Sequence, residues 1–303
     1  MALTINHNMM AMDTAMNLSK SYSALATSTR RLSSGLRVNS ASDDAAGLAV
    51  REIMRSEIKS LNQGVRNAND AISMIQTADG ALGVIDEKLI RMKELAMQSA
   101  TGTYSSDQRL IIDSEYQAMA SEITRIANAT DFNGIHLLNG NLSGATSAHN
   151  GNGLTASGPM KIHFGTSNDS AEDYYYVSIN TSTSSALGLG LGAAAKGGSN
   201  VNAGKSVSTQ SLAQAALSAL DNAIVSKDKI RANLGAMQNR LQNTITNLNV
   251  QAENTQAAES QVSDVDVATE MTNFTRNQIL TQSAVAMLAQ SNNLGKLAMQ
   301  LIG

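Results

Sequence analysis

Histidines and carboxylates are the residues of this sequence whose chemistry could serve catalysis or metal binding. The four histidines, which are scattered over unlike segments, are His7, His136, His149 and His163. No His-Glu-x-x-His pair is present to offer two imidazoles from one helix face to zinc. The chain also has no cysteine, which excludes thiol catalysis, disulfides and cysteine-ligated metals. The sequence therefore predicts no metal centre and no cofactor site.

Two short motifs invite a chemical interpretation. Asp43 and Asp44 are adjacent carboxylates, but they lie where a helix is expected to begin, and helix capping explains both. The glycines at 188, 190 and 192 resemble a dinucleotide-binding loop only loosely, because they lie in low-complexity sequence after no convincing strand. No catalytic constellation remains, and we predict that the protein is not an enzyme.

The composition favours long, thin helices over a thick globular core. Aromatic residues make up 3% of the chain and charged residues 16%, and Pro159 is the single proline. Much of the 42% hydrophobic content is alanine and methionine. A net charge of −3 argues against a nucleic-acid partner, and no apolar run is long enough to cross a bilayer. We expect neither nucleic-acid binding nor membrane insertion, and no cleaved secretory signal is visible.

Apolar residues recur at spacings of three and four along most of the chain, as in one seam of a coiled coil. This pattern predicts helices over residues 1–36, 44–99, 212–257 and 264–303. Another helix should begin at Ser105 or Ser106 and fold back along its predecessor. The predicted fold is mainly α, a long antiparallel coiled-coil rod whose terminal helices pair at one end.

Polar residues interrupt the apolar stripe of the helix predicted over 212–257. Lys227, Arg231 and Gln238 stand on that stripe. Since such side chains are seldom buried without a partner, we expect part of the stripe to be solvated.

Residues 131–206 differ from the rest because glycine, serine, asparagine and threonine dominate them. Phe132–Ile135 reads as a tight turn, and short strands are predicted at Met160–Phe164 and Tyr174–Ile179. We expect a small β-hairpin region with exposed loops.

These elements predict three domains. Residues 1–43 and 258–303 would form a terminal helical domain, and residues 44–140 and 206–257 a helical rod. Residues 141–205 would form a small β and loop region that completes the rod.

A hinge is predicted between the first two helices, with a matching restart before the last one. Gly35 weakens the first helix, and the polar stretch that follows supplies N-cap side chains with carboxylates in the next first turn. The predicted hinge and cap residues are Gly35, Asn39, Ser42, Asp43, Asp44 and Ser263.

The terminal helices carry a predicted assembly seam. Their stripes of alanine, methionine and a few leucines are too poor to stabilise two isolated helices. We expect them to be disordered in the free subunit and to order against further copies, in a contact that propagates as a helical filament. The seam residues are Leu18, Tyr22, Leu25, Leu32, Leu280, Met287, Leu288, Leu294 and Leu301.

Methionines crowd the start of the first helix at positions 9, 10, 12 and 16. A methionine cluster can form an adaptable binding surface, but its more frequent role is to fill gaps in a helix seam. We therefore favour packing as the role of this cluster.

Short motifs in both helical ends of the chain carry a family resemblance. They occupy Leu25–Thr27, Arg31–Ser40, Ser42–Ala49, Leu95–Ala100, Asp131–Gly134, Asp266–Glu270, Arg276–Leu280 and Leu288–Asn292. In these motifs the chain resembles bacterial flagellin, over about residues 1–140 and 205–303. Its short central region resembles flagellins that lack large outer domains.

The resemblance implies a structural subunit that polymerises into the bacterial flagellar filament for swimming motility. It implies that the terminal helices form the inner tube and the rod the surrounding layer. Flagellins are exported unfolded without a cleaved signal and assemble at the filament tip, so the expected location is the extracellular flagellum. The implied partners are further copies of the chain, an export chaperone at the C-terminal helix, the filament cap and junction proteins, and the host Toll-like receptor for flagellin.

The receptor resemblance can be placed on individual residues. Flagellins that the receptor senses present an arginine and a leucine one helical turn apart, with a glutamate on the neighbouring helix. These positions match Arg91, Leu95 and Glu115, and the first two share a helix face at i, i+4. The alternative is that Arg91 and Glu115 only decorate or pair across a solvated surface.

Two other functions stay open at this point. A hook–filament junction protein shares helical termini with flagellin, although the density of matching motifs disfavours it. An adhesin would rely on residues 141–206, which are short and poor in aromatic anchors.

Overall fold

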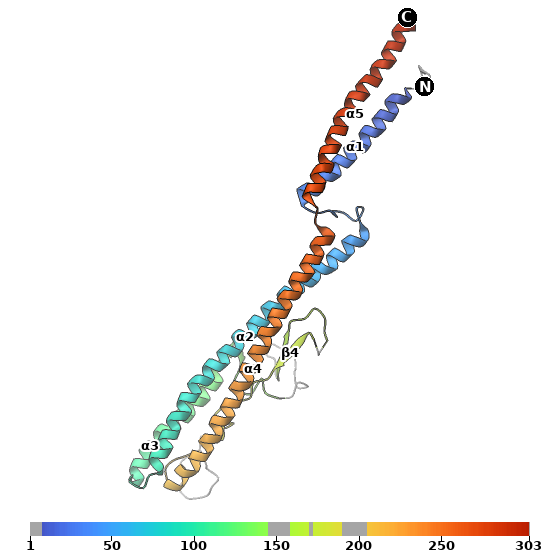
Figure 1. Cartoon of the computed structure of the whole chain (residues 1–303). Coiled ribbons are helices and arrows are strands. Elements are labelled where there is room, and N and C mark those ends of the chain that lie inside the picture. The colour runs from blue at the N-terminus through green and yellow to red at the C-terminus, as the bar shows by residue number, and fades with distance from the viewer. Residues whose placement is uncertain (1–7, 145–157, 170–171, 190–204, 303) are drawn as a thin grey trace. The chain divides into compact units, whose positions relative to one another are not determined.

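Helices dominate the computed structural model, which describes residues 8–144, 158–169, 172–189 and 205–302, with side chains in the last helix described up to residue 293. The elements in chain order are α1 (Met9–Ser34), α2 (Ala45–Ala100), α3 (Ser106–Ala129), β1 (Asp131–Phe132), β2 (Ile135–His136), β3 (Met160–His163), β4 (Tyr174–Val177), α4 (Gln210–Ser263) and α5 (Val267–Ile302). The mainly α prediction with a small hairpin region is confirmed (Figure 1). The predicted low-complexity loops lie largely outside the described residues.

The helix boundaries lie close to those predicted, with one clear difference. The α4 helix continues to Ser263 instead of ending near residue 257. No glycine or proline lies between 258 and 263, so nothing in the local sequence terminates the helix there.

The contacts divide the chain into two units. The terminal unit comprises Met1–Ile58 and Ala252–Gly303, and the central unit comprises Lys59–Gln251. The two units are described separately below.

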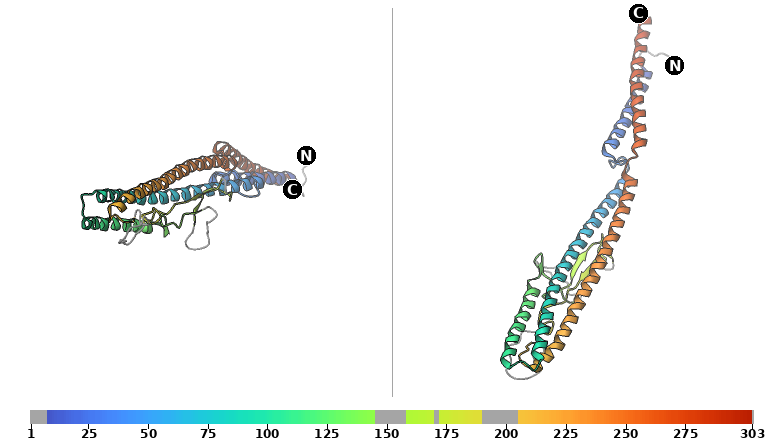
Figure 2. Two further views of the ribbon diagram at one scale, coloured as in Figure 1. Left: turned by 90° about the horizontal axis from the view of Figure 1, so that it is seen from below. Right: turned by 60° about the vertical axis from the view of Figure 1, so that its left-hand side comes forward.

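The central unit holds the hydrophobic core. In it, α2 and α4 lie side by side, and α3 folds back beside α2 (Figures 1 and 2). Large apolar side chains from all three helices are buried completely, among them Leu82, Leu89, Ile123 and Leu220. Their spacings of three and four along each helix place them on one stripe, as the sequence predicts. The core is thin and long because each helix contributes one stripe.

A capping box begins α3, and Ser105 is the one of the two predicted serines that caps it. The Ser105 hydroxyl accepts from the Gln108 backbone N–H, and the Gln108 side chain accepts from the Ser105 N–H. Arg109 donates to the Ser99 and Thr101 carbonyls at 3.0 and 2.9 Å, which satisfies acceptors at the end of α2. These contacts make the reversal between α2 and α3 compact.

Two antiparallel hairpins follow α3. Asn133 and Gly134 both adopt positive φ, at 53° and 79°, which is the backbone of the two-residue turn between β1 and β2. The second hairpin pairs β3 with β4, and both strands are shorter than predicted. Arg240 of α4 lies 3.6 Å from the Tyr175 ring centre and so attaches this hairpin to the helix.

Gly64 of α2 permits the backbone after β3 to approach the helix closely. A Cβ atom at this position would lie 2.0 Å from the Phe164 carbonyl oxygen. The neighbouring Asn67 amide donates to the His163 carbonyl at 2.8 Å. This glycine, which looks like a mild interruption of a helical pattern, is therefore a contact site.

Ion pairs join α2 to α4 in the central unit. Lys227 Nζ lies 2.6 Å from Asp86 Oδ1 and 2.8 Å from Asp228 Oδ1, and its side chain is only 2% exposed. Arg231 lies 2.7 Å from Asp79. The prediction that this stripe is solvated is corrected for Lys227, because its charge is neutralised by α2 across the helix interface.

Candidate assembly surface

The contact between α1 and α5 in the terminal unit buries several small polar side chains. The two helices lie side by side along their length (Figure 1). Ser28, Thr281 and Ser291 are buried there, and the Asn8 amide donates to the Ser291 carbonyl at 3.0 Å. Small side chains let the helices approach closely but bury little apolar area. The pair therefore has a weak hydrophobic core of its own.

A charged pair lies within this contact. Arg31 Nη1 stands 3.6 Å from Glu270 Oε2, and the glutamate side chain is 8% exposed. Since a largely buried carboxylate needs a counter-charge, this pair fixes the neighbouring ends of α1 and α5 to one another.

The predicted assembly seam divides between two faces. Leu18, Leu25, Leu32 and Leu288 are half-buried within the terminal unit. Tyr22, Leu280 and Met287 are exposed by 54%, 48% and 57% respectively. Leu294 and Leu301 belong to α5, and their side chains lie outside those described. The seam is thus not one continuous stripe: part of it holds α1 against α5, and part faces outward.

The methionines of the terminal helices correct the packing prediction. Met9, Met10, Met12 and Met16 are exposed by 47–59%, so they do not fill a seam within this chain. Met9, Met12 and Met16 follow one another at i, i+3 and i+7, which places them on one outward face of α1. A soluble protein rarely exposes such a run of large apolar groups without a partner.

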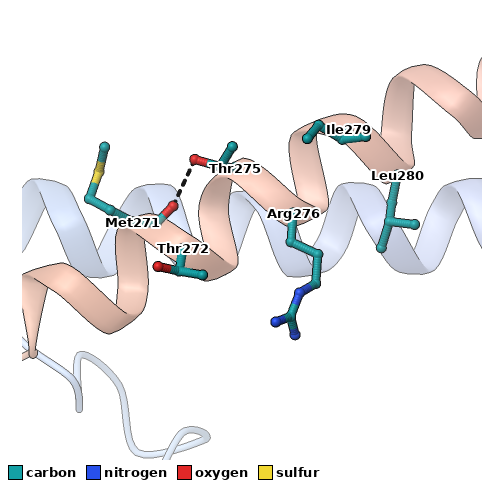
Figure 3. A pocket seen from close by; sticks show the side chains of 6 residues that line it. All are labelled: Met271, Thr272, Thr275, Arg276, Ile279 and Leu280. Carbon is teal, nitrogen blue, oxygen red and sulfur yellow. Dashed lines mark hydrogen bonds between the residues drawn. The ribbon is translucent and has the colours of Figure 1, made fainter.

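A surface pocket near the start of α5 presents a further apolar area. Figure 3 shows its lining, which is Met271, Thr272, Thr275, Arg276, Ile279 and Leu280. Met271 is 47% exposed and Ile279 is 58% exposed. The pocket offers an apolar contact area that also includes the guanidinium of Arg276.

The segments that leave α1 and α4 are joined by backbone hydrogen bonds within the terminal unit. Gly35 ends α1 with φ at 73°, and its N–H donates to the Arg31 carbonyl, as a helix-ending glycine does. The Arg37 N–H then donates to the Ser263 carbonyl at 2.7 Å, and the Val265 N–H to the Gly35 carbonyl at 3.0 Å. The predicted hinge therefore consists of two segments that are held together by backbone hydrogen bonds.

Two arginines brace this joint through backbone carbonyls. The Arg37 guanidinium donates to the Val262 carbonyl at 2.8 Å, and Arg51 of α2 donates to the Val38 carbonyl at 2.9 Å. Val38 itself is 2% exposed. The prediction missed both arginines because a guanidinium that binds a carbonyl leaves no local sequence signature.

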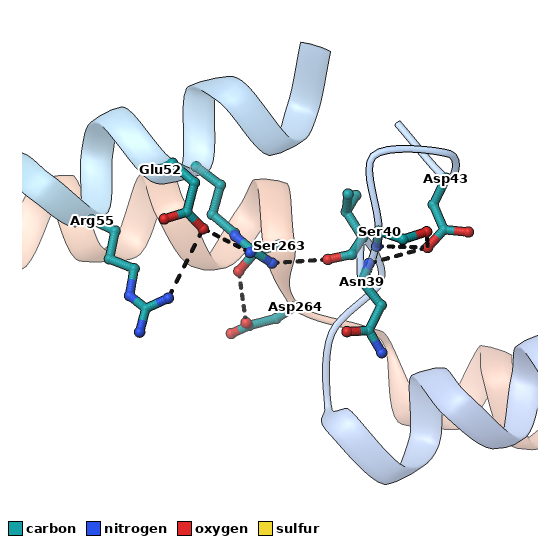
Figure 4. Close-up of polar contacts among 9 residues, drawn as sticks. Asn39, Ser40, Asp43, Glu52, Arg55, Ser263 and Asp264 are labelled. Atoms are coloured by element: carbon teal, nitrogen blue, oxygen red, sulfur yellow. Dashed lines mark hydrogen bonds and ion pairs between the residues drawn. The ribbon is translucent and has the colours of Figure 1, made fainter. Parts of the chain in front are cut away.

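The polar residues after Gly35 have more specific roles than predicted (Figure 4). Asp43 accepts from the backbone N–H groups of Asn39 and Ser40 and from the Ser40 hydroxyl, which closes a turn. The hydrogen bonds from Ser40 hold the pKa of Asp43 below its ordinary value. Ser42 is exposed, and its hydroxyl lies 2.8 Å from that of Ser40.

Asp44 caps α2. Its carboxylate accepts from the Gly47 N–H at 2.9 Å, and α2 has no acidic residue in its first turn. The predicted capping side chain is therefore confirmed and belongs to Asp44. The prediction of a carboxylate in the first turn of α2 is wrong. Asp43 and Asp44 both lie before the first helical residue.

The restart before α5 is capped by a residue other than the one predicted. Ser263 is the last residue of α4, and its hydroxyl donates to Asp264 at 3.0 Å (Figure 4). Asp266 caps α5, accepting from the Ala268 N–H at 3.0 Å and from the Thr269 hydroxyl at 2.6 Å. These bonds, with that from Thr269 the largest, lower the pKa of Asp266. The Asp-x-x-Thr spacing is the signal that could have identified this cap.

The three residues matched to receptor recognition do not share one exposed surface. Arg91 donates to Glu115 of α3 at 3.0 and 2.9 Å and to Glu94 at 2.9 Å, and these ion pairs raise the pKa of Arg91, with Glu115 contributing most. Leu95 is 1% exposed and belongs to the central core. The i, i+4 spacing gives neighbouring positions on α2, but the Leu95 side chain packs into the hydrophobic core while Arg91 stays half exposed. The structure thus corrects the surface placement of Leu95 and brings Arg91 and Glu115 together.

Neither a metal site nor a membrane span is found in the part of the chain that the structure describes. Its His, Asp and Glu residues form no group of three that could hold a metal ion. Among the same residues, no helix combines the length and apolar character needed to cross a bilayer.

Family comparisons account for both ends of the chain. The bacterial flagellin N-terminal helical region matches residues 5–143, and the bacterial flagellin C-terminal helical region matches residues 217–302. Together the two matches cover more than half of the sequence.

Curated relatives align over nearly the whole length. Flagellin FlaB2 of Treponema pallidum (strain Nichols) is 40% identical over 300 residues, covering 99% of this chain and 100% of that protein. The flagellar filament 33 kDa core protein of Treponema phagedenis is 42% identical with the same coverage. Flagellin of Bacillus subtilis (strain 168) is 40% identical over 307 residues, at 99% and 100% coverage.

Two solved structures resemble this chain to different degrees. A putative flagellar hook-associated protein from Vibrio parahaemolyticus has a TM-score of 0.54 at 16% identity, covering 73% of this chain and 100% of that one. The crystal structure of Bacillus cereus flagellin is 29% identical, with a TM-score of 0.46 and coverage of 64% and 94%. The first likeness shows the fold alone.

Proposed function

The chain belongs to the bacterial flagellin family, and from that premise we propose that the outward faces of α1 and α5 join its copies into a filament. The protein is a structural subunit of the extracellular flagellar filament, which serves motility, and it is not an enzyme. The observation that carries the proposal is the exposure of large apolar side chains on α1 and α5. Tyr22, Ile279 and Met287 are each more than half exposed.

The chemistry of these faces favours association with further copies of the chain. A pair of helices that buries serine and threonine internally and presents methionine and isoleucine outward gains more by contacting copies than by folding alone. We propose that residues 1–43 and 258–303 form the inner tube of the filament. Residues 44–140 and 206–257, completed by 141–205, would form the surrounding rod layer.

Removal of α5's second half tests the proposal. A chain lacking residues 281–303 keeps the whole central unit and should remain a helical monomer by circular dichroism and light scattering. It should form no filament when seeded with sheared filaments of the intact chain, because Met287 and its neighbours are gone. Electron microscopy of both chains under identical seeding gives the answer, and a truncated chain that still polymerised would contradict the proposal.

Other proteins of the flagellar system are proposed as partners on the same surface. An export chaperone at the C-terminal helix would cover the apolar face of α5 before assembly, and the filament cap and junction proteins would contact it afterwards. The pocket lined by Met271, Ile279 and Leu280 supports such a cover, because it leaves apolar area in water. Export in an unfolded form is consistent with the weak internal contact of α1 with α5.

Recognition by the host Toll-like receptor for flagellin is proposed for Arg91 and Glu115. Both side chains are about half exposed, at 49% and 42%, and their ion pair places charge on the surface formed by α2 and α3. Leu95 supports this surface from the core beneath it.

Substitution of Arg91 tests the receptor proposal. Arg91→Ala should weaken receptor activation in a cell reporter assay without changing monomer helicity, since an exposed ion pair contributes about 0–1 kcal/mol to stability. Arg66→Ala, which removes an exposed arginine elsewhere on α2, is the matched control and should leave activation unchanged. Equal signalling by wild type and Arg91→Ala would remove the assignment.

The two alternative functions gain no support of their own. The likeness to a hook-associated protein reflects the shared fold, whereas the curated relatives with about 40% identity are named as flagellins or filament core proteins. The adhesin alternative relied on residues 141–206, much of which lies outside the described residues.

A further inference from the structure

Methionine is the most readily oxidised side chain in this protein. The sequence contains fifteen methionines but neither cysteine nor tryptophan. Thioether oxidation turns a flexible apolar side chain into a polar, chiral sulfoxide. Where these methionines lie therefore determines what an oxidant does to the protein.

The most exposed of the described methionines lie mainly on α1 and α5. Every methionine side chain described on α1 and α5 is exposed, by 47–59%, namely Met9, Met10, Met12, Met16, Met271 and Met287. In the central unit Met74 and Met92 are exposed by 2% and 0%. Met97 of α2, at 60%, is the exposed methionine of that unit among the residues described. An oxidant in solution can therefore reach the sulfurs of these six methionines and that of Met97, while Met74 and Met92 are shielded.

We propose that these six methionines, which we call the terminal methionine set, form an oxidation-sensitive site whose sulfoxides block polymerisation of the free subunit. The inference rests on the proposed function of α1 and α5 as the assembly faces. Reaction with hydrogen peroxide transfers one oxygen atom to the thioether sulfur. The S–O bond forms as the O–O bond breaks, the sulfur loses two electrons to the peroxide, and the peroxide leaves as water.

Oxidation is expected to impair assembly without unfolding the monomer. A sulfoxide on an exposed α1 or α5 face remains hydrated in the monomer, so the fold tolerates it. Assembly would bury that S–O dipole against apolar groups, and a buried polar group without a hydrogen-bond partner is strongly disfavoured. Ser28, Thr281 and Ser291 are buried in the terminal unit, whereas each of the six methionines is at least 47% exposed.

The decisive experiment uses the full-length monomer and hydrogen peroxide as the probe. Mild treatment should convert the terminal methionine set to sulfoxides while Met74 and Met92 stay unmodified, as measured by peptide mass spectrometry. Filament elongation from sheared seeds should then fall roughly tenfold or more, with circular dichroism unchanged. Treatment with the two epimer-specific methionine sulfoxide reductases and dithiothreitol should restore elongation. Elongation that is unaffected by full oxidation of the set would overturn the proposal.

A partition measurement keeps the test independent of any variant. In a partly oxidised wild-type sample, sulfoxides of the terminal methionine set should be depleted from pelleted filaments and enriched in the supernatant. The sulfoxide of Met97 should divide equally between the two fractions. Equal division of both kinds of sulfoxide would also overturn the proposal.

Two variants separate the sites from general damage. Met97→Leu should lose elongation on peroxide treatment as strongly as wild type does. A chain with leucine at all six positions should show the same elongation rate before and after treatment, whatever its starting rate. If untreated wild type fails to elongate seeds, the proposed assembly function fails; if it elongates equally well when oxidised, only this inference fails.

Discussion

The terminal and central units use similar helices in opposite ways. In the central unit, leucine and isoleucine fill the core and the charged groups pair across helices, as Lys227 does with Asp86. In the terminal unit, serine and threonine are buried between α1 and α5, while Tyr22 and Met287 face outward. The first arrangement stabilises a monomer, and the second leaves apolar area for further copies. A helix that is amphipathic in sequence therefore does not reveal which partner its apolar stripe serves.

The largest expected effect contrasts a leucine from each unit. Leu220→Ala in the central unit removes a side chain that is 0% exposed, and it should lower the free energy of unfolding by about 2–5 kcal/mol. Leu280→Ala on α5 removes one that is 48% exposed and should change it by less than about 0.5 kcal/mol. Urea unfolding of both monomers, followed by circular dichroism, measures these values.

Filament growth should reverse that order. Leu280→Ala should slow seeded elongation although it leaves the monomer intact, because the missing side chain belongs to the proposed assembly face. Folded Leu220→Ala, assayed under conditions where it remains native, should elongate close to normally. If Leu280→Ala destabilised the monomer as much as Leu220→Ala, the distinction between the two units would not stand.

Helix periodicity made much of this fold predictable, and the limits of the prediction are local ones. The apolar stripes placed the five helices, and the start of α3 was predicted to within one residue, at Ser105 or Ser106. Asp44 and Asp266 were harder to assign because several polar residues precede each helix, and only the backbone path decides which one caps. Leu95 was misplaced because its spacing from Arg91 does not tell how many helices cover α2.

Long-range pairing lay beyond the reach of the sequence. Lys227 and its partner Asp86 are 141 residues apart, so no local pattern connects them. The outward methionines were likewise unpredictable, since the same spacing serves a buried seam or an exposed one. The division of the seam between the α1–α5 contact and the outer face depends on how the two helices are rotated, which only coordinates reveal.

A smaller effect is expected from the ion pair of the central unit. Asp86→Ala leaves Lys227 buried with only the exposed Asp228 as a counter-charge, and it should lower the free energy of unfolding by about 1–3 kcal/mol. Lys227→Met removes the buried charge while it keeps the apolar stem, and it should fall within about 1 kcal/mol of wild type. Urea unfolding measures both values. If both variants lost the same free energy of unfolding, the ion pair itself would stabilise the unit, and Asp86 would do more than neutralise a buried charge.

The smallest effect concerns acid and the cap of α5 in the terminal unit. The pKa of Asp266 is lowered by hydrogen bonds from Thr269 and Ala268, so the folded state binds its proton more weakly than the unfolded chain does. This contribution to stability is fully present above the unfolded pKa of about 3.9, and it is lost as pH falls through the lower folded value. Thr269→Val removes the hydroxyl donor and should raise the pKa of Asp266 toward its ordinary value, as followed by NMR titration of the carboxyl carbon. Asp43, whose pKa is lowered by Ser40 instead, is the internal control and should titrate unchanged in that variant. If the pKa of Asp266 does not move, the Thr269 hydroxyl is not its cause, and the restart of α5 depends on the backbone donors of its first turn.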